Sequence, residues 1–259
     1  MNIVKELYKL RKGVTYRDSD HTYWRGDKRL ISTTQLKERY KQPFDTEYWS
    51  TYKVIQAQEE VKKIKHHKEG YYVNDKFISF SEAQEIYREE AEELKKEWTK
   101  IAEKAKVKGT AIHVLFEMAW MGEITENETI NQFCQERLDR EWIPVGVEMM
   151  VANDWVAGRF DGLFYYKDKY FIRDIKTDKI IKYGNPYQYM KEPFNDLEDC
   201  NYSGYTVQLN LYRDIIEKGS EIKIEGMMID HYKDTGENVS IEVIQIPKYE
   251  IPWERLEQK

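Results

Sequence analysis

Two aspartates and a lysine in the second half of the chain have the spacing of a metal-dependent catalytic site. Asp174 and Lys176 are two residues apart in the run FIRDIK, so on a β-strand their side chains project from the same face. A tight turn at Lys167-Asp168 would set Asp161 directly opposite Asp174 on the neighbouring strand. Because carboxylates at that separation repel each other, we expect a hard divalent cation, Mg²⁺ or Mn²⁺, between them.

The residues around these aspartates predict that both strands are largely buried. A single aspartate on a strand is most often a solvated edge or turn residue, but here apolar side chains flank the pair: Phe160, Leu163, Phe164, Phe171, Ile172 and Ile175. A buried carboxylate without a partner is costly, which favours a bound cation. Lys176 beside it would orient or deprotonate an attacking water and offset phosphate charge, whereas alone it would be an ordinary ion-pair lysine.

Two further residues are candidate metal ligands. His113 lies in an apolar run, 109–121, that predicts a helix, with Glu117 one turn later on the same face. The imidazole is either a structural group or a third ligand whose tautomer Glu117 fixes. Glu148, on the apolar predicted strand 145–151, is a ligand, a group that supports a ligand or a strand-edge charge, and the sequence leaves these open.

A polar pair on the last predicted helix has two interpretations. Gln208 and Tyr212 are four residues apart in the helix expected over 203–218. Either the helix is simply amphipathic and packs through its leucines and isoleucines, or the pair reaches a phosphate or a base. The spacing alone does not choose between them.

The elements that must position these residues follow from hydrophobic periodicity. From residue 109 the pattern predicts helices over 109–121 and 128–141, strands over 145–151, 155–166 and 169–176, a loop of about 25 residues, a helix over 203–218, and strands near 222–230 and 239–246. This order, α, a further α, then β, β, β, α, β, predicts an α/β fold.

The N-terminal half reads as a hairpin followed by helices. The segment 21–29 predicts a short hairpin around Gly26-Asp27, and Ser32-Thr33-Thr34 suit the N-cap of a helix over 35–40. Residues 47–68 are expected to be helical. Ser81, with Gln84 as its capping-box partner, would begin a second long helix that ends at about Lys106. No linker separates these parts, so one integrated domain is expected.

Four short motifs, taken together, resemble the PD-(D/E)xK nuclease superfamily and specifically its RecB-like exonuclease branch. They are GTAIH at 109–113, GRFDG at 158–162, DIK at 174–176 and QLNLY at 208–212, in the order of that branch and on the expected helix, strand, strand and helix. The segment HTYWRGDKRLISTTQLKERYKQPFD is similar to the beginning of phage nucleases and mitochondrial genome maintenance exonucleases. The resemblance covers 21–50 loosely and 105–230 well.

The resemblance implies a fold, a ligand set and roles. It implies a restriction-endonuclease-like core over 109–259, a central mixed β-sheet flanked by helices in the order α-β-β-β-α-β, with an N-terminal hairpin and helical elaboration over 1–108. It implies His113, Asp161, Asp174 and the Ile175 carbonyl as metal ligands, Lys176 as the catalytic lysine, and Gln208 and Tyr212 as active-site supports. Asp174 stands where glutamate is commoner. Only two cysteines are present, so the four-cysteine iron–sulfur cluster of some relatives is excluded.

Charge and tyrosine content bear on the substrate. The net charge is −6, but the first 70 residues sum to +6 and the remainder to −12. A basic cluster would guide a phosphate backbone: Lys62, Lys63, Lys65, His66, His67 and Lys68. The loop before the last helix holds Tyr183, Tyr187, Tyr189, Tyr202 and Tyr205, which would stack unpaired bases or are ordinary packing residues. We therefore expect DNA that is single-stranded or has free ends as the partner.

The expected function is that of a metal-dependent deoxyribonuclease, most simply an exonuclease, which hydrolyses phosphodiester bonds. The alternatives are a structure-specific or restriction-type endonuclease on the same fold, and a non-catalytic nucleic-acid-binding protein. The resemblance to phage proteins suggests a role in DNA recombination, repair or replication, with recombination or replication proteins as further partners.

Composition excludes other classes of protein. The chain is 259 residues long, 41% hydrophobic and 34% charged, which is globular composition. No run approaches 18 apolar residues and the N-terminus lacks an apolar signal core, so neither a membrane span nor secretion is expected. With two cysteines and no disulfide framework, the expected compartment is the cytoplasm, that of the host if the chain is phage-encoded.

Overall fold

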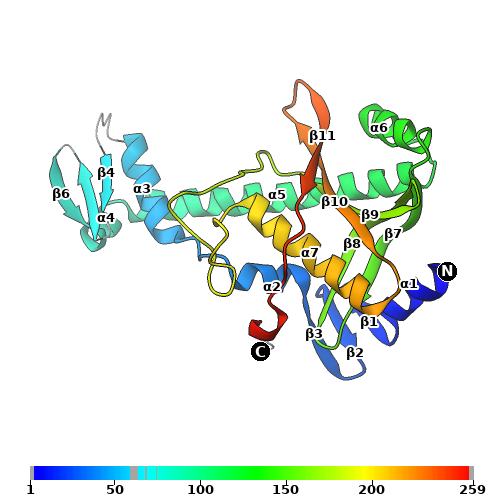
Figure 1. Ribbon diagram of the computed structural model, residues 1–259. Helices are drawn as coiled ribbons and strands as arrows, with labels where there is room; N and C mark the ends of the chain where they lie inside the picture. Colours follow the sequence, from blue (N-terminus) through cyan, green and yellow to red (C-terminus); the bar gives the residue numbers. More distant parts are fainter. Residues whose placement is uncertain (1–2, 59–63, 68, 74, 257–259) are drawn as a thin grey trace. The chain divides into compact units, whose positions relative to one another are not determined.

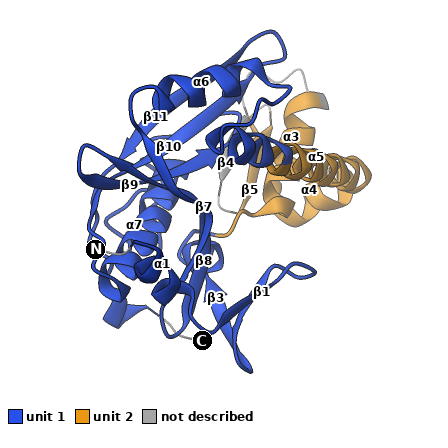
Figure 2. Ribbon diagram, turned by 90° about the vertical axis from the view of Figure 1, so that its right-hand side faces the viewer, with its two compact units in different colours: residues 1–42, 111–259 blue, residues 43–110 orange. Residues whose placement is uncertain are grey.

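The computed structural model describes residues 3–58, 64–67, 69–73 and 75–256 and contains two compact units (Figure 1). The larger unit comprises residues 1–42 and 111–259, and the smaller comprises residues 43–110 (Figure 2). The boundary falls inside helix α5, Arg88–Trp120. Within the described residues, none of the helices combines the length and the apolar character that crossing a membrane requires.

The larger unit contains a mixed, eight-stranded sheet (Figure 1). Its path is β1-β2-β3-β8-β9-β10-β11, with β7 paired to β8. The β8–β9 and β7–β8 pairs are antiparallel, whereas β9–β10 and β3–β8 are parallel. The strands are β1 Val14–Arg17, β2 Thr22–Arg25, β3 Lys28–Ser32, β7 Ile143–Ala152, β8 Val156–Tyr166, β9 Lys169–Lys176, β10 Ile224–Asp234 and β11 Val239–Ile246.

Helices cover both faces of this sheet. Neighbouring residues of β8 enter different hydrophobic cores, as side chains alternate along a strand. Leu163 packs in the core to which α7 contributes, and Phe164 packs in the core of α5 and α6. The helices of this unit are α1 Ile3–Arg11, α2 Thr33–Arg39, the end of α5, α6 Glu128–Leu138, α7 Asn201–Gly219 and a 3₁₀ turn at Trp253–Arg255. The architecture is therefore a mixed α/β fold with a central sheet flanked by helices.

The smaller unit has a core of its own. It contains α3 Thr46–Gln58, the antiparallel strands β4 Ile64–His67, β5 Gly70–Val73 and β6 Lys76–Ser79, α4 Phe80–Ile86 and the beginning of α5. Ile55 and Tyr71 are fully buried, and Ala83 packs beside them. Residues of α3, β5, β6, α4 and α5 therefore form one apolar cluster.

Several local predictions are confirmed. The hairpin around Gly26-Asp27 forms, with Arg25 paired to Lys28. Ser32 caps α2 with a capping box in which its side chain accepts from the backbone N–H of Gln35. From residue 109 the observed order of helices and strands is the predicted one.

The predicted register between β8 and β9 is also confirmed. Leu163 pairs with Ile172, and the last backbone pair, Gly162 with Arg173, lies one step before Asp161. Lys167 and Asp168 have φ of 46° and 62°. Positive φ at both central positions is typical of a type I′ hairpin turn, which therefore forms here although the favoured Asn-Gly sequence is absent.

The predictions of a helix over 47–68 and of a second helix from Ser81 to about Lys106 are wrong in three places. Residues 64–67, expected in a helix that runs to 68, form strand β4, because they pair with β5. The cap of α4 is Ser79 and not Ser81: the Ser79 side chain accepts from the N–H of Glu82. The long helix then starts anew at Arg88 and continues through Gly109, because one glycine in a helix interior costs only about 1 kcal/mol.

The chain divides at other residues than the expected boundary between an N-terminal elaboration over 1–108 and a core over 109–259. Residues 1–42 belong to the larger unit, because β3 pairs with β8, Ile31 with Val156 and Ser32 with Ala157. Only residues 43–110 form a separate unit.

Candidate active site

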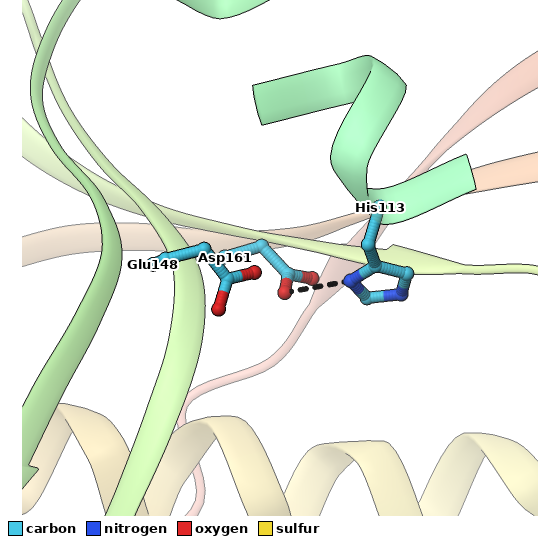
Figure 3. Close-up of side chains that lie close together, drawn as sticks. All are labelled: His113, Glu148 and Asp161. Atoms are coloured by element: carbon cyan, nitrogen blue, oxygen red, sulfur yellow. Dashed lines mark hydrogen bonds and ion pairs between the residues drawn. The ribbon is translucent and has the colours of Figure 1, made fainter. Parts of the chain in front are cut away.

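Three side chains from three elements converge in the larger unit (Figure 3). His113 of α5, Glu148 of β7 and Asp161 of β8 each offer one ligand atom, and these atoms all lie within 4.8 Å of one another. His113 Nδ1 is 3.0 Å from Asp161 Oδ1. Two carboxylates and one imidazole suit a hard or borderline divalent cation such as Mg²⁺ or Mn²⁺. The donor set therefore fits the expected metal.

Strand register places the acidic residues in a row. Val147 pairs with Gly162 and Met149 with Phe160, so Glu148 and Asp161, which lie between these pairs, are directly opposite each other. Glu148 has φ of 50°, a left-handed conformation that is strained for a residue with a side chain. Such strain is concentrated at functional sites, where neighbouring structure maintains it. The register of β8 and β9 extends the row to Asp174.

The neighbours of Asp161 stabilise its charged form. Its Oδ2 accepts a hydrogen bond from the backbone N–H of Ile175 at 2.5 Å. Burial alone would raise the pKa of Asp161, but the hydrogen bond with His113, the charges of His113 and Lys176 and the Ile175 N–H together lower it. Burial likewise opposes the charged form of His113, but the hydrogen bond to Asp161 and the charges of Asp161 and Asp174 together outweigh burial and raise the His113 pKa. The site thus keeps one carboxylate charged.

Glu148 has the opposite behaviour. Burial first and the charge of Asp161 second raise its pKa to about 7, against the opposing charge of Arg159. The Arg159 Nε lies 2.6 Å from Glu148 Oε2. A cation that binds the cluster therefore competes with a proton for Glu148 near neutral pH.

We expect divalent-cation affinity to rise with pH because of this proton. Below its raised pKa Glu148 is protonated and competes with the metal, and above it the carboxylate is available. One such proton changes the affinity for Mn²⁺ by about tenfold between about pH 6 and about pH 8, and His113 acts in the same direction. Titration calorimetry at both pH values measures this change. Glu148→Gln should bind more weakly and flatten the pH dependence; equal wild-type affinity at the two pH values would contradict the assignment.

Asp174 and Lys176 form an ion pair on β9 next to the cluster. Asp174 is only 2% exposed, and burial is the main cause of its raised pKa, which Lys176 opposes. Burial lowers the pKa of Lys176, but Asp174 and Asp161 outweigh burial and raise it. The structure therefore brings potential ligand atoms of His113, Asp161 and Glu148 together, while Asp174 contacts Lys176. Asp174 and the Ile175 carbonyl as metal ligands stay predictions.

Gln208 and Tyr212 connect α7 to α2 and β8. The Tyr212 hydroxyl donates to the Arg159 carbonyl at 2.9 Å and accepts from the Thr33 hydroxyl at 2.9 Å. Gln208 donates to the Tyr212 hydroxyl at 3.3 Å. A Cβ on Gly158 would lie 2.5 Å from Thr33 Oγ1, so only glycine allows this close approach. Both residues are buried supports of the strand that carries Asp161.

Sequence reasoning missed two residues of this region. Arg159 is the ion-pair partner of Glu148. It lies inside the motif GRFDG, so its position in that motif was a signal that could have identified it. Lys37 of α2 is 6% exposed, and its Nζ lies 3.3 Å from Gln208 Oε1. No local signal identifies Lys37, because the contact between Lys37 and Gln208 joins distant parts of the chain.

Glu117 was expected to fix the tautomer of His113. The hydrogen bond of the His113 ring is made with Asp161, and Glu117 contributes its charge to the raised pKa of Glu148.

The residues expected to contact DNA have different surroundings. Tyr183 and Tyr187 are 57% and 94% exposed, as stacking would require. The expectation that Tyr205 is a stacking platform is wrong, because Tyr205 is buried and its hydroxyl donates to Asp178 at 2.5 Å.

Of the lysines expected to contact DNA, Lys62 and Lys63 lie outside the described residues. Lys65 lies on β4.

Comparisons with known proteins add little to this geometry. No protein-family model matches the chain, and no curated protein matches it. Among solved structures, the chain is similar to the crystal structure of SSO0001, with 17% identity over 79% of each chain and a TM-score of 0.28. A likeness at that TM-score carries no argument about fold or function.

Proposed function

We propose that this protein is an Mg²⁺- or Mn²⁺-dependent DNA nuclease with a restriction-endonuclease-like core of the PD-(D/E)xK, RecB-like type. The observation that carries the proposal is the convergence of His113, Glu148 and Asp161, with the Asp174–Lys176 pair on the adjacent strand. His113, Asp161, Asp174 and Gln208, one residue from each of the four motifs, all belong to the larger unit. A structural ion pair would not require a third acidic residue, Glu148, in a strained backbone conformation beside Asp161.

The residues divide the chemistry of phosphodiester hydrolysis among them. His113, Glu148 and Asp161 would hold the cation, which supplies a Lewis acid for the phosphate and lowers the pKa of a bound water. Asp174 holds the Lys176 ammonium beside this row. Lys176 would orient the attacking water and stabilise the charge that develops on the phosphate. Tyr212 and Gln208 would act indirectly, by fixing β8 against α2 and α7.

The proposed substrate is DNA that is single-stranded or has a free end, and the reaction is exonucleolytic. The exposed rings of Tyr183 and Tyr187 support single-strand binding, since bases stack on aromatic side chains without regard to sequence. A role in phage-type recombination, repair or replication, with proteins of those processes as partners, belongs to the same proposal.

Linear and circular single-stranded DNA distinguish this proposal from its alternatives. Purified protein is incubated with each substrate in Mg²⁺, in Mn²⁺ and in EDTA, and the products are resolved on a gel. The proposal expects metal-dependent loss of the linear strand while the circle remains intact. Cutting of the circle would identify an endonuclease on the same site, and binding without cutting of either would identify a non-catalytic protein.

A further inference from the structure

Lys37 is a buried cation that the proposed chemistry does not use. It lies on α2 and is 6% exposed. Burial, with the charge of Lys176 as the next cause, lowers its pKa to about 8. Among the described residues, the carboxylate that pairs with its Nζ is that of Glu38, at 3.5 Å, and the Glu38 side chain is half exposed to solvent. Burying an ammonium with so weak a counterion is costly, which suggests that an anion binds there.

Gln208 holds the Lys37 ammonium in place. The Gln208 amide nitrogen faces two hydroxyls, those of Tyr212 at 3.3 Å and Thr34 at 3.4 Å. Its oxygen must therefore face Lys37, from which it accepts at 3.3 Å. An ammonium has three donors, and this bond satisfies one of them while fixing the direction of the side chain.

Lys37 and Lys176 converge on one aromatic ring. Their Nζ atoms lie 5.4 Å and 5.2 Å from the ring centroid of Tyr205. The hydroxyl of Tyr205 is fixed by Asp178. Lys176 has the buried carboxylate of Asp174 as its partner, whereas Lys37 has no such group among its described contacts. The charge of Lys176 therefore disfavours the charged form of Lys37, and a bound anion would offset this repulsion.

The surface beside this pair suits an extended anion. Gly204, at the beginning of α7, leaves room for the stems of Lys37 and Lys41: a Cβ there would be 3.5 Å and 3.3 Å from them. Lys41 in turn lines a cavity of about 460 Å³, together with Lys182 and the exposed Tyr187. A strand bound at Lys37 would thus have further lysines and an aromatic ring along its path.

We propose that Lys37 binds a phosphate of the substrate strand that neighbours the scissile one, and so positions the strand for cleavage. This inference rests on the proposed nuclease function and names a phosphate contact within it. Lys37 is then a positioning residue, whose charge contributes to strand affinity and to KM rather than to the chemical step.

The test compares Lys37→Met and Lys37→Arg with wild type. Binding of a fluorescent single-stranded oligonucleotide is followed by anisotropy at several salt concentrations with the metal chelated, and KM is measured in Mn²⁺. Lys37→Met should weaken binding and raise KM by about tenfold, and should lower the slope of log affinity against log salt by about 0.7, the value for one phosphate contact on a single strand. Lys37→Arg should retain the slope. As a matched control, Lys169→Met, at the other end of β9, should leave all three quantities unchanged.

The outcomes separate this inference from the function on which it rests. If wild type neither binds nor cuts any strand, the proposed function fails. If wild type cuts while Lys37→Met keeps the wild-type KM and salt slope, the Lys37 assignment alone is overturned. A lower melting temperature of Lys37→Met with an unchanged salt slope would show a structural lysine and would also overturn it.

Discussion

Lys176→Met is expected to lower the rate of metal-dependent DNA cleavage by about 10³-fold, because it removes the ammonium that orients water and stabilises phosphate charge. The side chain lies beside Asp174 and within the field of Asp161. The measurement is the initial rate of release of labelled nucleotides from a linear single strand in saturating Mn²⁺. Cleavage at the wild-type rate by the folded variant would remove Lys176 from the mechanism.

A stability control is needed for this variant. Without Lys176, the carboxylate of Asp174 would be buried and uncompensated, which costs about 3 kcal/mol or more at pH 7. Asp174→Asn/Lys176→Met removes both charges and should recover most of the lost free energy of unfolding. It should not recover cleavage. The comparison separates loss of chemistry from loss of folded protein.

Asp230→Ala is expected to have the largest effect on stability, a loss of about 3–5 kcal/mol in the free energy of unfolding. Asp230 is fully buried and accepts two hydrogen bonds from Arg173, at 2.9 Å from Nε and 2.5 Å from a terminal nitrogen. Arg173 is itself 3% exposed and lies near the rings of Trp120 and Trp142. Removing the carboxylate leaves a buried guanidinium without its counterion. Denaturant unfolding measures the loss.

The paired variant gives the matched control for this prediction. Arg173→Met/Asp230→Leu replaces the ion pair by apolar side chains of similar size and should be far closer to wild type than Asp230→Ala. A loss below about 1 kcal/mol in Asp230→Ala would mean that water reaches the pair, contrary to its burial. Because Arg173 lies among aromatic rings of α5 and α6 and neither residue is a proposed ligand, the folded double variant should still cleave DNA.

The parts of the site that lie on one hairpin could be predicted from the sequence. The apolar alternation of β8 and β9 and the short turn at Lys167-Asp168 determine the register, so Asp161 and the Asp174–Lys176 pair follow from local contacts. The Ser32 cap of α2 is equally local, since donor and acceptor are three residues apart. These predictions rest on rules that apply within a short stretch of chain.

The remainder depends on contacts between distant segments. Glu148 faces Asp161 and itself has a positive φ, a backbone conformation that a glutamate in the sequence does not predict. Lys37 reaches Gln208 because α2 packs on α7, far along the chain. Strand β4 has a mostly polar sequence and forms by pairing with β5, so its period does not distinguish it from a helix. In the sequence, Tyr205 does not differ from the exposed Tyr183 and Tyr187, and only the fold shows that Tyr205 is buried.

If His113, Glu148 and Asp161 hold a divalent cation that drives DNA cleavage, the cleavage rate must depend on that cation and on Asp161. The initial rate of cleavage of a linear single strand is followed as Mn²⁺ is added to EDTA-treated protein, for wild type and for Asp161→Asn, which keeps the shape of the side chain. We expect a rate that rises from zero to saturation for wild type and stays near zero for Asp161→Asn. Cleavage by wild type in EDTA, or equal rates for the two proteins, would contradict it.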